Sequence, residues 1–333
     1  MKRILFAGFG LVLSTLALGQ QAPQFTQFMQ AGAVYNPAFT GINPYADFKL
    51  GFRKQWMGIP NAPTTLFASF SGQFGTVEPT LSLPVRGRLA SQFVTEKPKA
   101  KVGPKHALGG YIIADQTSPT SLNVGNLSYA VHIPLNEDLK LSVGAGLSVT
   151  QSSLNRDKLN VDLRQDPGIG TGVSSKLNPD FNAGFLMHGK SFFAGYSANY
   201  LMRNEIYSLS DNKTLVGQQK VHHYGLLGYK FAFNSDWYAV PGVLVKYVDG
   251  APASMDVNIR MGYKELLWFG PSFRNQDAIS VFAGFHASNF VSFSYAYDYT
   301  LSKLNTASTG SHEIILGLRL VRSGASTARP TLW

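Results

Sequence analysis

The sequence contains no cysteine, which excludes disulfides and thiol chemistry. Charged side chains are also scarce, at 14% of residues, where a typical soluble domain has about 25%. After residue 19, no uncharged apolar run approaches the roughly 20 residues that a transmembrane helix requires. These absences argue against an ordinary soluble enzyme and against a helical membrane protein.

Aromatic residues and glycine, by contrast, are abundant. Aromatics make up 13% of the chain, and 33 glycines are scattered along it. In a closed membrane barrel, lipid-facing and lumen-facing residues alternate along each strand, so mean hydropathy stays flat while every strand has two unlike faces. Mean hydropathy is indeed close to zero, which is typical of such a barrel.

The first 19 residues have the pattern of a secretory signal peptide. Lys2 and Arg3 precede an uncharged run, residues 4–18, and Ala17-Leu18-Gly19 supplies small residues at its end. No cysteine follows that could carry a lipid anchor. We therefore expect residues 1–19 to direct export across the inner membrane.

Residues 290–301, FVSFSYAYDYTL, show a strict alternation. Valine, phenylalanine and tyrosine occupy one side of the extended chain, while small or polar residues, including Asp298, occupy the other. Residues 139–150, 255–264 and 313–320 repeat the pattern. Runs of about 10 residues suit a tilted strand that crosses a bilayer, whereas strands of a soluble sandwich are usually about 5 to 6 residues long. Charge on the small face favours a water-filled lumen.

The alternation predicts an all-β fold, a transmembrane antiparallel β-barrel of about 14 strands. The expected strands are 46–56, 64–75, 107–115, 120–133, 139–152, 180–188, 191–202, 220–233, 237–248, 253–264, 266–274, 278–287, 289–300 and 311–321. An even number closes an antiparallel barrel without a free edge. We expect the barrel to span residues 45–321 and residues 322–333 to form a C-terminal tail.

The connections predict an orientation. With the first strand starting in the periplasm, the periplasmic turns are short, and the outer loops include the long segments 153–179 and 203–219. Residues 76–106 break this pattern, because they form a long periplasmic connection rich in proline and cations. Its candidate periplasmic docking residues are Arg86, Arg88, Lys97, Lys99 and Lys101. The alternative is a solvated, disordered excursion.

Other function classes find little support. The formal net charge is +10, but two of these charges belong to the signal peptide and many others alternate inward, so we expect no nucleic-acid partner. His222 and His223 are adjacent and point to opposite faces of a strand, so they do not jointly bind a metal. No Gly-x-Ser-x-Gly, P-loop or His-Glu-x-x-His motif occurs. We expect no enzyme activity and no catalytic, metal or cofactor site.

The N-terminal region resembles the PorP/SprF family of outer-membrane proteins of the Bacteroidetes type IX secretion system. The family's opening Pro-Gln-Phe-Ser-Gln block is similar to residues 23–27, and its Tyr-Asn-Pro-Ala block is similar to residues 35–41. Its Arg-x-Gln-Trp-x-Gly-Ile-x-x-Ala-Pro block is similar to residues 53–63, with Lys54 and Met57 at variable positions. The resemblance extends to residue 321, and the chain departs from the expected closing strand in residues 321–333.

The resemblance implies an accessory barrel in the outer membrane that receives C-terminal sorting domains of cargo, or retains secreted adhesins for gliding motility. Periplasmic ring proteins or lipoproteins of the system are further implied partners, besides membrane lipid. A passive channel or a transporter of hydrophobic substrates is the alternative, and an anchor without a role in export is a third possibility.

Two regions are candidates for such a role. Residues 20–44 are turn-rich and do not alternate, so we expect them, with Tyr35, Asn36 and Pro37, to plug a lumen that fourteen strands leave unfilled; a periplasmic tail is the alternative. We expect cargo to bind at the outer rim. The alternatives are that its Pro, Asn, Asp and Gly residues simply form turns and that its aromatic residues belong to an interfacial girdle. The candidate cargo-binding residues are Trp56, Gly58, Ile59, Pro60, Asn61, Arg274, Asp277 and Tyr299.

Overall fold

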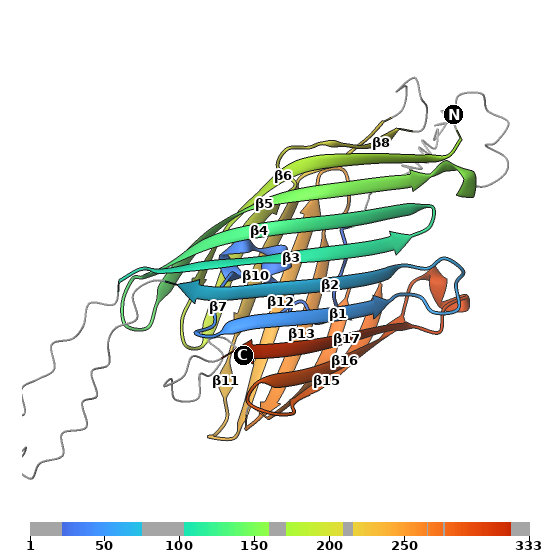
Figure 1. The fold of residues 1–333 in the computed structure, drawn as a ribbon. Helices are drawn as coiled ribbons and strands as arrows, with labels where there is room; N and C mark the ends of the chain where they lie inside the picture. The colour runs from blue at the N-terminus through green and yellow to red at the C-terminus, as the bar shows by residue number, and fades with distance from the viewer. Residues whose placement is uncertain are drawn as a thin grey trace, which may run out of the picture.

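The computed structural model describes residues 22–74, 103–159, 171–208, 216–264, 266–275 and 277–320. Its strands close into a barrel (Figure 1). The expected signal peptide, the C-terminal tail and the candidate periplasmic docking residues lie outside the described residues; the last group is Arg86, Arg88, Lys97, Lys99 and Lys101.

The barrel is built from long strands in chain order. They are β1 (Ala46–Lys54), β2 (Thr64–Phe74), β3 (Lys105–Thr117), β4 (Thr120–Pro134), β5 (Lys140–Asn155), β6 (Val173–His188), β7 (Phe192–Asn199), β10 (His222–Tyr229), β11 (Phe231–Ala232), β12 (Trp237–Val248), β13 (Ser254–Tyr263), β14 (Leu267–Arg274), β15 (Ala278–His286), β16 (Val291–Thr300) and β17 (Ser311–Leu320). A small separate hairpin consists of β8 (Glu205–Ser208) and β9 (Val216–Gln218).

Every neighbouring pair in the main sheet is antiparallel, and the sheet closes on itself. The first strand pairs with the last, β1 with β17, and β10 pairs with both β7 and β12. Strands β10 and β11 both pair with β12 and together occupy one strand position in the wall. The 15 strands of the sheet therefore form a 14-stranded barrel. The all-β, fourteen-stranded antiparallel barrel predicted from the alternation is confirmed.

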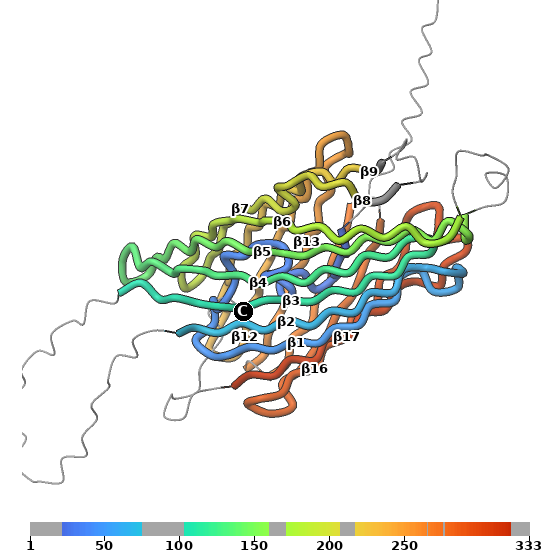
Figure 2. The backbone as a smooth tube through the Cα atoms, turned by 45° about the horizontal axis from the view of Figure 1, so that its top comes forward, coloured from blue at the N-terminus to red at the C-terminus, as the bar shows by residue number. Residues whose placement is uncertain are grey.

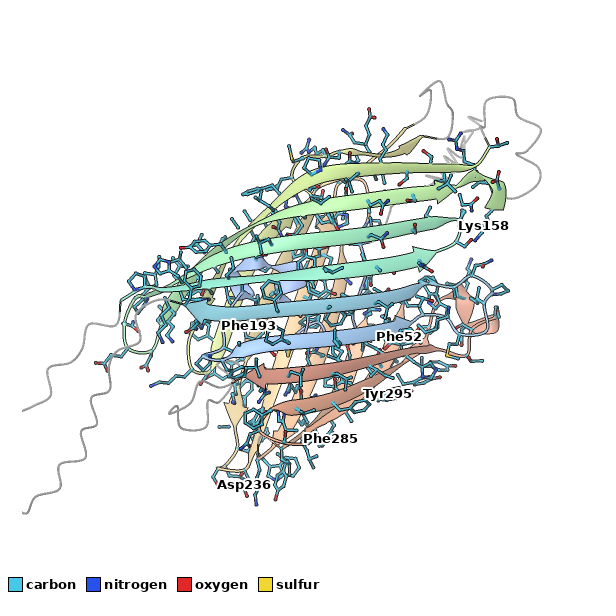
Figure 3. All side chains as sticks on the ribbon, in the orientation of Figure 1. Phe52, Lys158, Phe193, Asp236, Phe285 and Tyr295 are labelled. Carbon is cyan, nitrogen blue, oxygen red and sulfur yellow. The ribbon has the colours of Figure 1, made fainter. Side chains whose placement is uncertain are left out.

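The two ends of the barrel differ. At one end, here called the short-turn end, the turns after β4, β6, β11, β13 and β15 are brief. The connections after β1, β5, β7 and β16 lie at the other end, here called the loop end. In Figure 3, Asp236 marks the short-turn end and Lys158 the loop end.

The faces of the strands agree with the predicted alternation. On β16, Tyr295 and Tyr299 are exposed on the outside, whereas Ser294 and Asp298 are buried in the interior. Strand β17 repeats this, with Leu316 outside and Glu313 inside. The apolar face therefore meets lipid, and the small, polar face lines the lumen.

Aromatic and histidine side chains ring the outer surface near both ends. Toward the loop end, the Tyr295 hydroxyl lies 2.6 Å from Nδ1 of His312. Toward the short-turn end, the Trp237 and Tyr263 rings lie 4.7 Å apart. Such girdles sit at the membrane–water interfaces of barrels, where a ring can be apolar on one side and hydrogen-bonded on the other.

Strands β5 and β6 are longer than the sequence indicated. Residues 153–155 and 173–179, expected in a loop, pair with each other as far as Asn155 and Val173. Their outward face mixes the apolar Val173 and Leu177 with polar residues such as Ser175, whose Oγ accepts from the Gln151 side chain at 3.3 Å. Because Ser175 and Pro179 interrupt the apolar series here, alternation alone did not identify this part of the wall as strand.

Residues 22–45 lie inside the barrel, between the front and back walls in both views (Figures 1 and 2). They include a short helix, α1 (Gly32–Tyr35), and a 3₁₀ turn, η1 (Pro37–Phe39). Phe25, Phe28 and Phe39 are buried in one cluster with inward side chains of the wall, which are Phe67, Tyr111, Ile113, Val124, Leu186, Phe193, Tyr224, Leu226, Tyr238, Val240, Leu244 and Ile315. Among the described residues, no helix has the length and apolarity to cross a bilayer.

Candidate functional site

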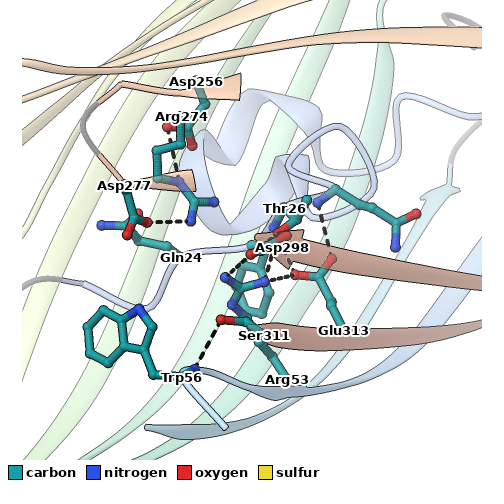
Figure 4. Close-up of polar contacts among 12 residues, drawn as sticks. Gln24, Thr26, Arg53, Trp56, Asp256, Arg274, Asp277, Asp298, Ser311 and Glu313 are labelled. Atoms are coloured by element: carbon teal, nitrogen blue, oxygen red, sulfur yellow. Dashed lines mark hydrogen bonds and ion pairs between the residues drawn. The ribbon is translucent and has the colours of Figure 1, made fainter. Parts of the chain in front are cut away.

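The N-terminal segment and the barrel wall meet at a buried ionic cluster near the loop end (Figure 4). Arg53 of β1 forms ion pairs with Asp298 of β16 at 2.6 Å and with Glu313 of β17 at 3.1 Å. All three side chains are only 1–2% exposed. We call these residues, together with Thr26, the Arg53 cluster.

Thr26 makes the N-terminal segment part of this cluster. Its backbone N–H donates to Glu313 Oε2 at 2.8 Å, and its hydroxyl donates to Asp298 Oδ1 at 2.7 Å. The backbone N–H of Gln27 donates to the other oxygen of Glu313 at 3.1 Å. The two carboxylates thus bind one guanidinium and three donors of the N-terminal segment, which compensates the cost of burying their charge.

A second buried ionic group continues the network along the wall. Arg274 of β14 contacts Asp256 of β13 at 3.3 Å and Asp277 at 3.0 Å. Lys246 of β12 lies 2.9 Å from Asp256 and also donates to the side chain of Gln24 at 3.2 Å. The loop half of the lumen therefore contains matched charges that hold residues 24–27 in place.

The Tyr-Asn-Pro block makes the next contacts with the wall. Asn36 is fully buried, and its side-chain amide donates to the carbonyl oxygens of Phe185 at 3.0 Å and Tyr196 at 3.3 Å. Its Oδ1 accepts from the N–H of Ala38 at 2.9 Å, which starts the 3₁₀ turn. The sequence had singled out Tyr35, Asn36 and Pro37, and their sealing of the lumen stays a prediction.

Close packing explains a glycine opposite this block. A Cβ on Gly144 of β5 would lie 2.5 Å from the backbone of Pro37 and Ala38. Tyr35 is also fixed, because its hydroxyl accepts from the N–H of Phe25 at 3.0 Å and its carbonyl accepts from Ser197 Oγ at 2.7 Å. The 3₁₀ turn therefore lies directly against the wall.

The loop between β1 and β2, residues 55–63, is held rigidly at the loop end. Met57 exchanges backbone hydrogen bonds with the neighbouring loop, donating to Gly310 at 2.8 Å and accepting from Thr309 at 2.7 Å. Three of its residues have positive φ angles, namely Trp56 at 46°, Gly58 at 97° and Asn61 at 60°. The loop is thus a defined surface feature.

The candidate rim residues divide by exposure. Gly58, Pro60, Asn61 and Tyr299 are exposed. Trp56 and Ile59 are half-buried under the same loop. Arg274 is buried in the wall, and Asp277 is half-buried against it, so these two belong to the ionic network and not to the exposed rim.

Strand alternation placed Asp298 and Glu313 on inward, polar faces, but it did not single out Arg53 or Thr26 or their association. Arg53, Asp298 and Glu313 each fall on the small, polar face of a strand, which predicts an inward direction. Their meeting depends on the register between the first and last strands, where Arg53 faces Glu313. Within the described residues, no group of three or more His, Asp or Glu side chains is arranged to hold a metal ion.

Several solved structures are similar to this chain at 10–11% sequence identity. Solved structures with a similar outline include a Pseudomonas aeruginosa FadL homologue (10% identity, 85% of this chain and 91% of that chain, TM-score 0.44) and the P. putida toluene transporter TodX (10%, 87% and 94%, 0.47). The CymD monoaromatic hydrocarbon channel is a third (11%, 88% and 93%, 0.48). No curated protein matches the sequence.

A family model provides the assignment. The model described as type IX secretion system membrane protein PorP/SprF matches residues 17–318, which is nearly the whole chain. Its range includes the Tyr-Asn-Pro block, the Arg53 cluster and the 55–63 loop. This chain belongs to the PorP/SprF family of type IX secretion system membrane proteins and has the fold of an outer-membrane β-barrel.

Proposed function

We propose that this barrel is a receptor or scaffold for cargo of type IX secretion, oriented with its short-turn end in the periplasm and its loop end outside. In this role it binds a C-terminal sorting domain or a secreted adhesin and does not itself conduct solutes. The observation that carries the proposal is the ordered N-terminal segment in the lumen, joined to a rigid rim by the Arg53 cluster.

The segment that lies in the lumen favours a scaffold over a channel. Residues 22–45 fill its centre with buried aromatic side chains, including Phe25, Phe28 and Phe39. The Arg53 cluster and Asn36 bind the two halves of this segment to opposite parts of the wall. A segment with so many buried polar contacts is costly to displace, because each unpaired group would lose its partner.

The rim supports docking of an extended peptide. The exposed residues of the 55–63 loop combine apolar groups, Met57 and Pro60, with the amide of Asn61. Since the loop is already ordered by its bonds to residues 309–310, binding there requires little further ordering of the barrel. Arg274 is not part of this surface.

The test is capture of cargo by rim variants. Ile59→Asp with Asn61→Asp changes the loop without touching the Arg53 cluster, and Lys158→Gln is a matched control on another loop at the same end. We expect the rim variant to keep its abundance in the membrane and its heat-modifiable mobility, but to co-purify less adhesin or sorting domain from native membranes. Full retention of cargo by a well-folded rim variant would refute docking on this loop.

Conductance in a planar bilayer tests the closed lumen separately. The wild-type barrel should be nearly silent, and deletion of residues 22–44 should open a conducting pore if the strands still close. A large steady conductance of the wild type would instead favour the channel or hydrophobic-substrate transporter.

A further inference from the structure

The lumen is charged differently in its two halves. In the loop half, the inward cations Arg53, Lys176, Lys246 and Arg274 each have a carboxylate within 3.3 Å. In the short-turn half, inward cations come from β1 and from strands on both sides of it. We call the following the basic vestibule: Lys49 of β1, Lys105 of β3, Lys140 of β5, Arg260 of β13 and Arg319 of β17.

Four of these five cations lack a matching acid among the described residues. Asp47 is the inward carboxylate on the described strands of this half, and it lies 2.9 Å from Lys49. Among the described residues, no ion pair joins Lys105, Lys140, Arg260 or Arg319 to a carboxylate within 4.0 Å. Like charges gathered on a wall of low dielectric create a positive potential that is little screened there.

Arg260 is the most buried of these cations. It is only 5% exposed, and its guanidinium lies 4.5 Å from the centre of the Trp268 ring. Its Nε has no hydrogen-bond partner among the described residues. Lys49, Arg260 and Arg319 line one small recess together with Asp47 and His286.

A second recess lies on the other side of β1, along β2 to β6. Lys105 and Lys140 line it together with His132 and His188. His132 is held by the Thr40 carbonyl at 3.0 Å and by Ser142 Oγ at 2.6 Å, which ties the floor of this recess to the N-terminal segment. The cations remain at its edge, toward the periplasmic opening that the proposed orientation requires.

We propose that the basic vestibule binds an acidic segment of a periplasmic protein. A single small anion contacts neighbouring groups only, whereas these cations are distributed over two separate recesses. A peptide with several carboxylates reaches both, and guanidinium groups bind carboxylates in a fixed fork geometry.

The chain's own neighbouring segments do not match this charge. Residues 75–102 contain Arg86, Arg88, Lys97, Lys99 and Lys101 against two glutamates, and residues 321–333 contain two arginines and no acid. On the turns of this end, Asp138 and Asp236 already pair with Lys190 and Lys264. Charge complementarity therefore points to a separate acidic chain.

The experiment measures binding of a defined acidic peptide to the detergent-purified, full-length barrel. The probe is a short fluorescein-labelled peptide in which glutamate alternates with serine, and its control has glutamine in place of glutamate. We expect fluorescence anisotropy to report binding of the acidic peptide alone. Binding should weaken as salt rises to about 0.15 M, where the Debye length falls to about 8 Å.

Two matched variants locate the site. Lys105→Gln with Lys140→Gln removes two vestibule charges at partly exposed positions, and we expect the Kd to rise about threefold to tenfold. Lys158→Gln with Lys303→Gln removes two exposed charges from the loop end and should leave the Kd unchanged. Arg260→Gln tests the deep recess where that variant folds.

Three results would overturn the proposal: equal binding of the glutamine peptide, an equal loss in the loop-end variant, or equally tight binding of a single-stranded DNA oligonucleotide. The last result would assign a generic polyanion surface. The proposal does not depend on cargo docking, since the rim variant Ile59→Asp with Asn61→Asp should bind the acidic peptide like the wild type.

Discussion

Removing Arg53 should be the most damaging single truncation in the polar part of the lumen. Arg53→Met keeps much of the side-chain volume but deletes the cation that Asp298 and Glu313 share at 2.6 and 3.1 Å. It also deletes a hydrogen bond of 2.7 Å from the guanidinium to the hydroxyl of Thr26. Two carboxylates then remain in the wall without a countercharge.

The expected loss follows from burial. All three charged side chains are at most 2% exposed, and breaking such a buried pair costs about 3–5 kcal/mol. A matched control comes from Lys264, whose ammonium lies 3.6 Å from Asp236 on a turn with both side chains roughly half exposed. Lys264→Met should cost about 0–1 kcal/mol.

The assay is equilibrium unfolding in urea of the barrel refolded into short-chain lipid vesicles, followed by tryptophan fluorescence. The variant Arg53→Met with Asp298→Asn and Glu313→Gln should regain most of the lost free energy of unfolding, because it leaves no uncompensated charge. If Arg53→Met proves no more costly than Lys264→Met, the ionic cluster does not hold the structure together as described.

Three further predictions follow from single positions. Leu316→Lys places a charge on the lipid face and should cost about 2–4 kcal/mol, whereas Gly317→Lys is on the lumen face, where the added Cβ would meet the Ser292 hydroxyl, and should cost less; equal costs in the urea assay would contradict the assigned faces. Gly58→Ala should cost about 1–3 kcal/mol, because the glycine has a φ of 97° and its Cβ would lie 2.9 Å from the Ala307 carbonyl; an unchanged urea midpoint would show that the loop adapts. Asn36→Ala removes two buried donor bonds and should cost about 1–3 kcal/mol, with increased protease cleavage of residues 22–45; unchanged cleavage would mean that Asn36 does not anchor the segment.

Much of the fold was predictable because a lipid bilayer imposes a strict rule on strands. On β16 and β17 the alternation of large and small residues identified both the strand and its inward face. The rule fails where the alternation is short and interrupted. Residues 173–179 pair fully with β5, yet Ser175 and Pro179 interrupt the outward apolar residues Val173 and Leu177.

The sequence predicts which side chains of the site point into the barrel, but not which of them contact one another. Parity along each strand places Arg53, Asp298 and Glu313 inside, and the same parity places Arg274 inside, next to the buried Ser272. Arg274 was assigned to the rim because a turn follows it, although its position on β14 indicates an inward side chain. The pairing of Arg53 with Glu313 depends on closure between β1 and β17, which are separated by most of the chain.

The Arg53 cluster joins the closure of the barrel to the placement of the N-terminal segment. Arg53 and Glu313 face each other across the seam between the first and last strands, and Thr26 bonds to both of them. The segment reaches β1 from the short-turn end, while Thr26 lies near the loop end, so the segment extends between the two ends with its aromatic side chains buried against the wall. Threading this polar and aromatic chain through a closed barrel would expose its buried groups without partners. Closing the barrel around the segment avoids that cost, because the N–H groups of Thr26 and Gln27 then donate to Glu313 as its carboxylate becomes buried.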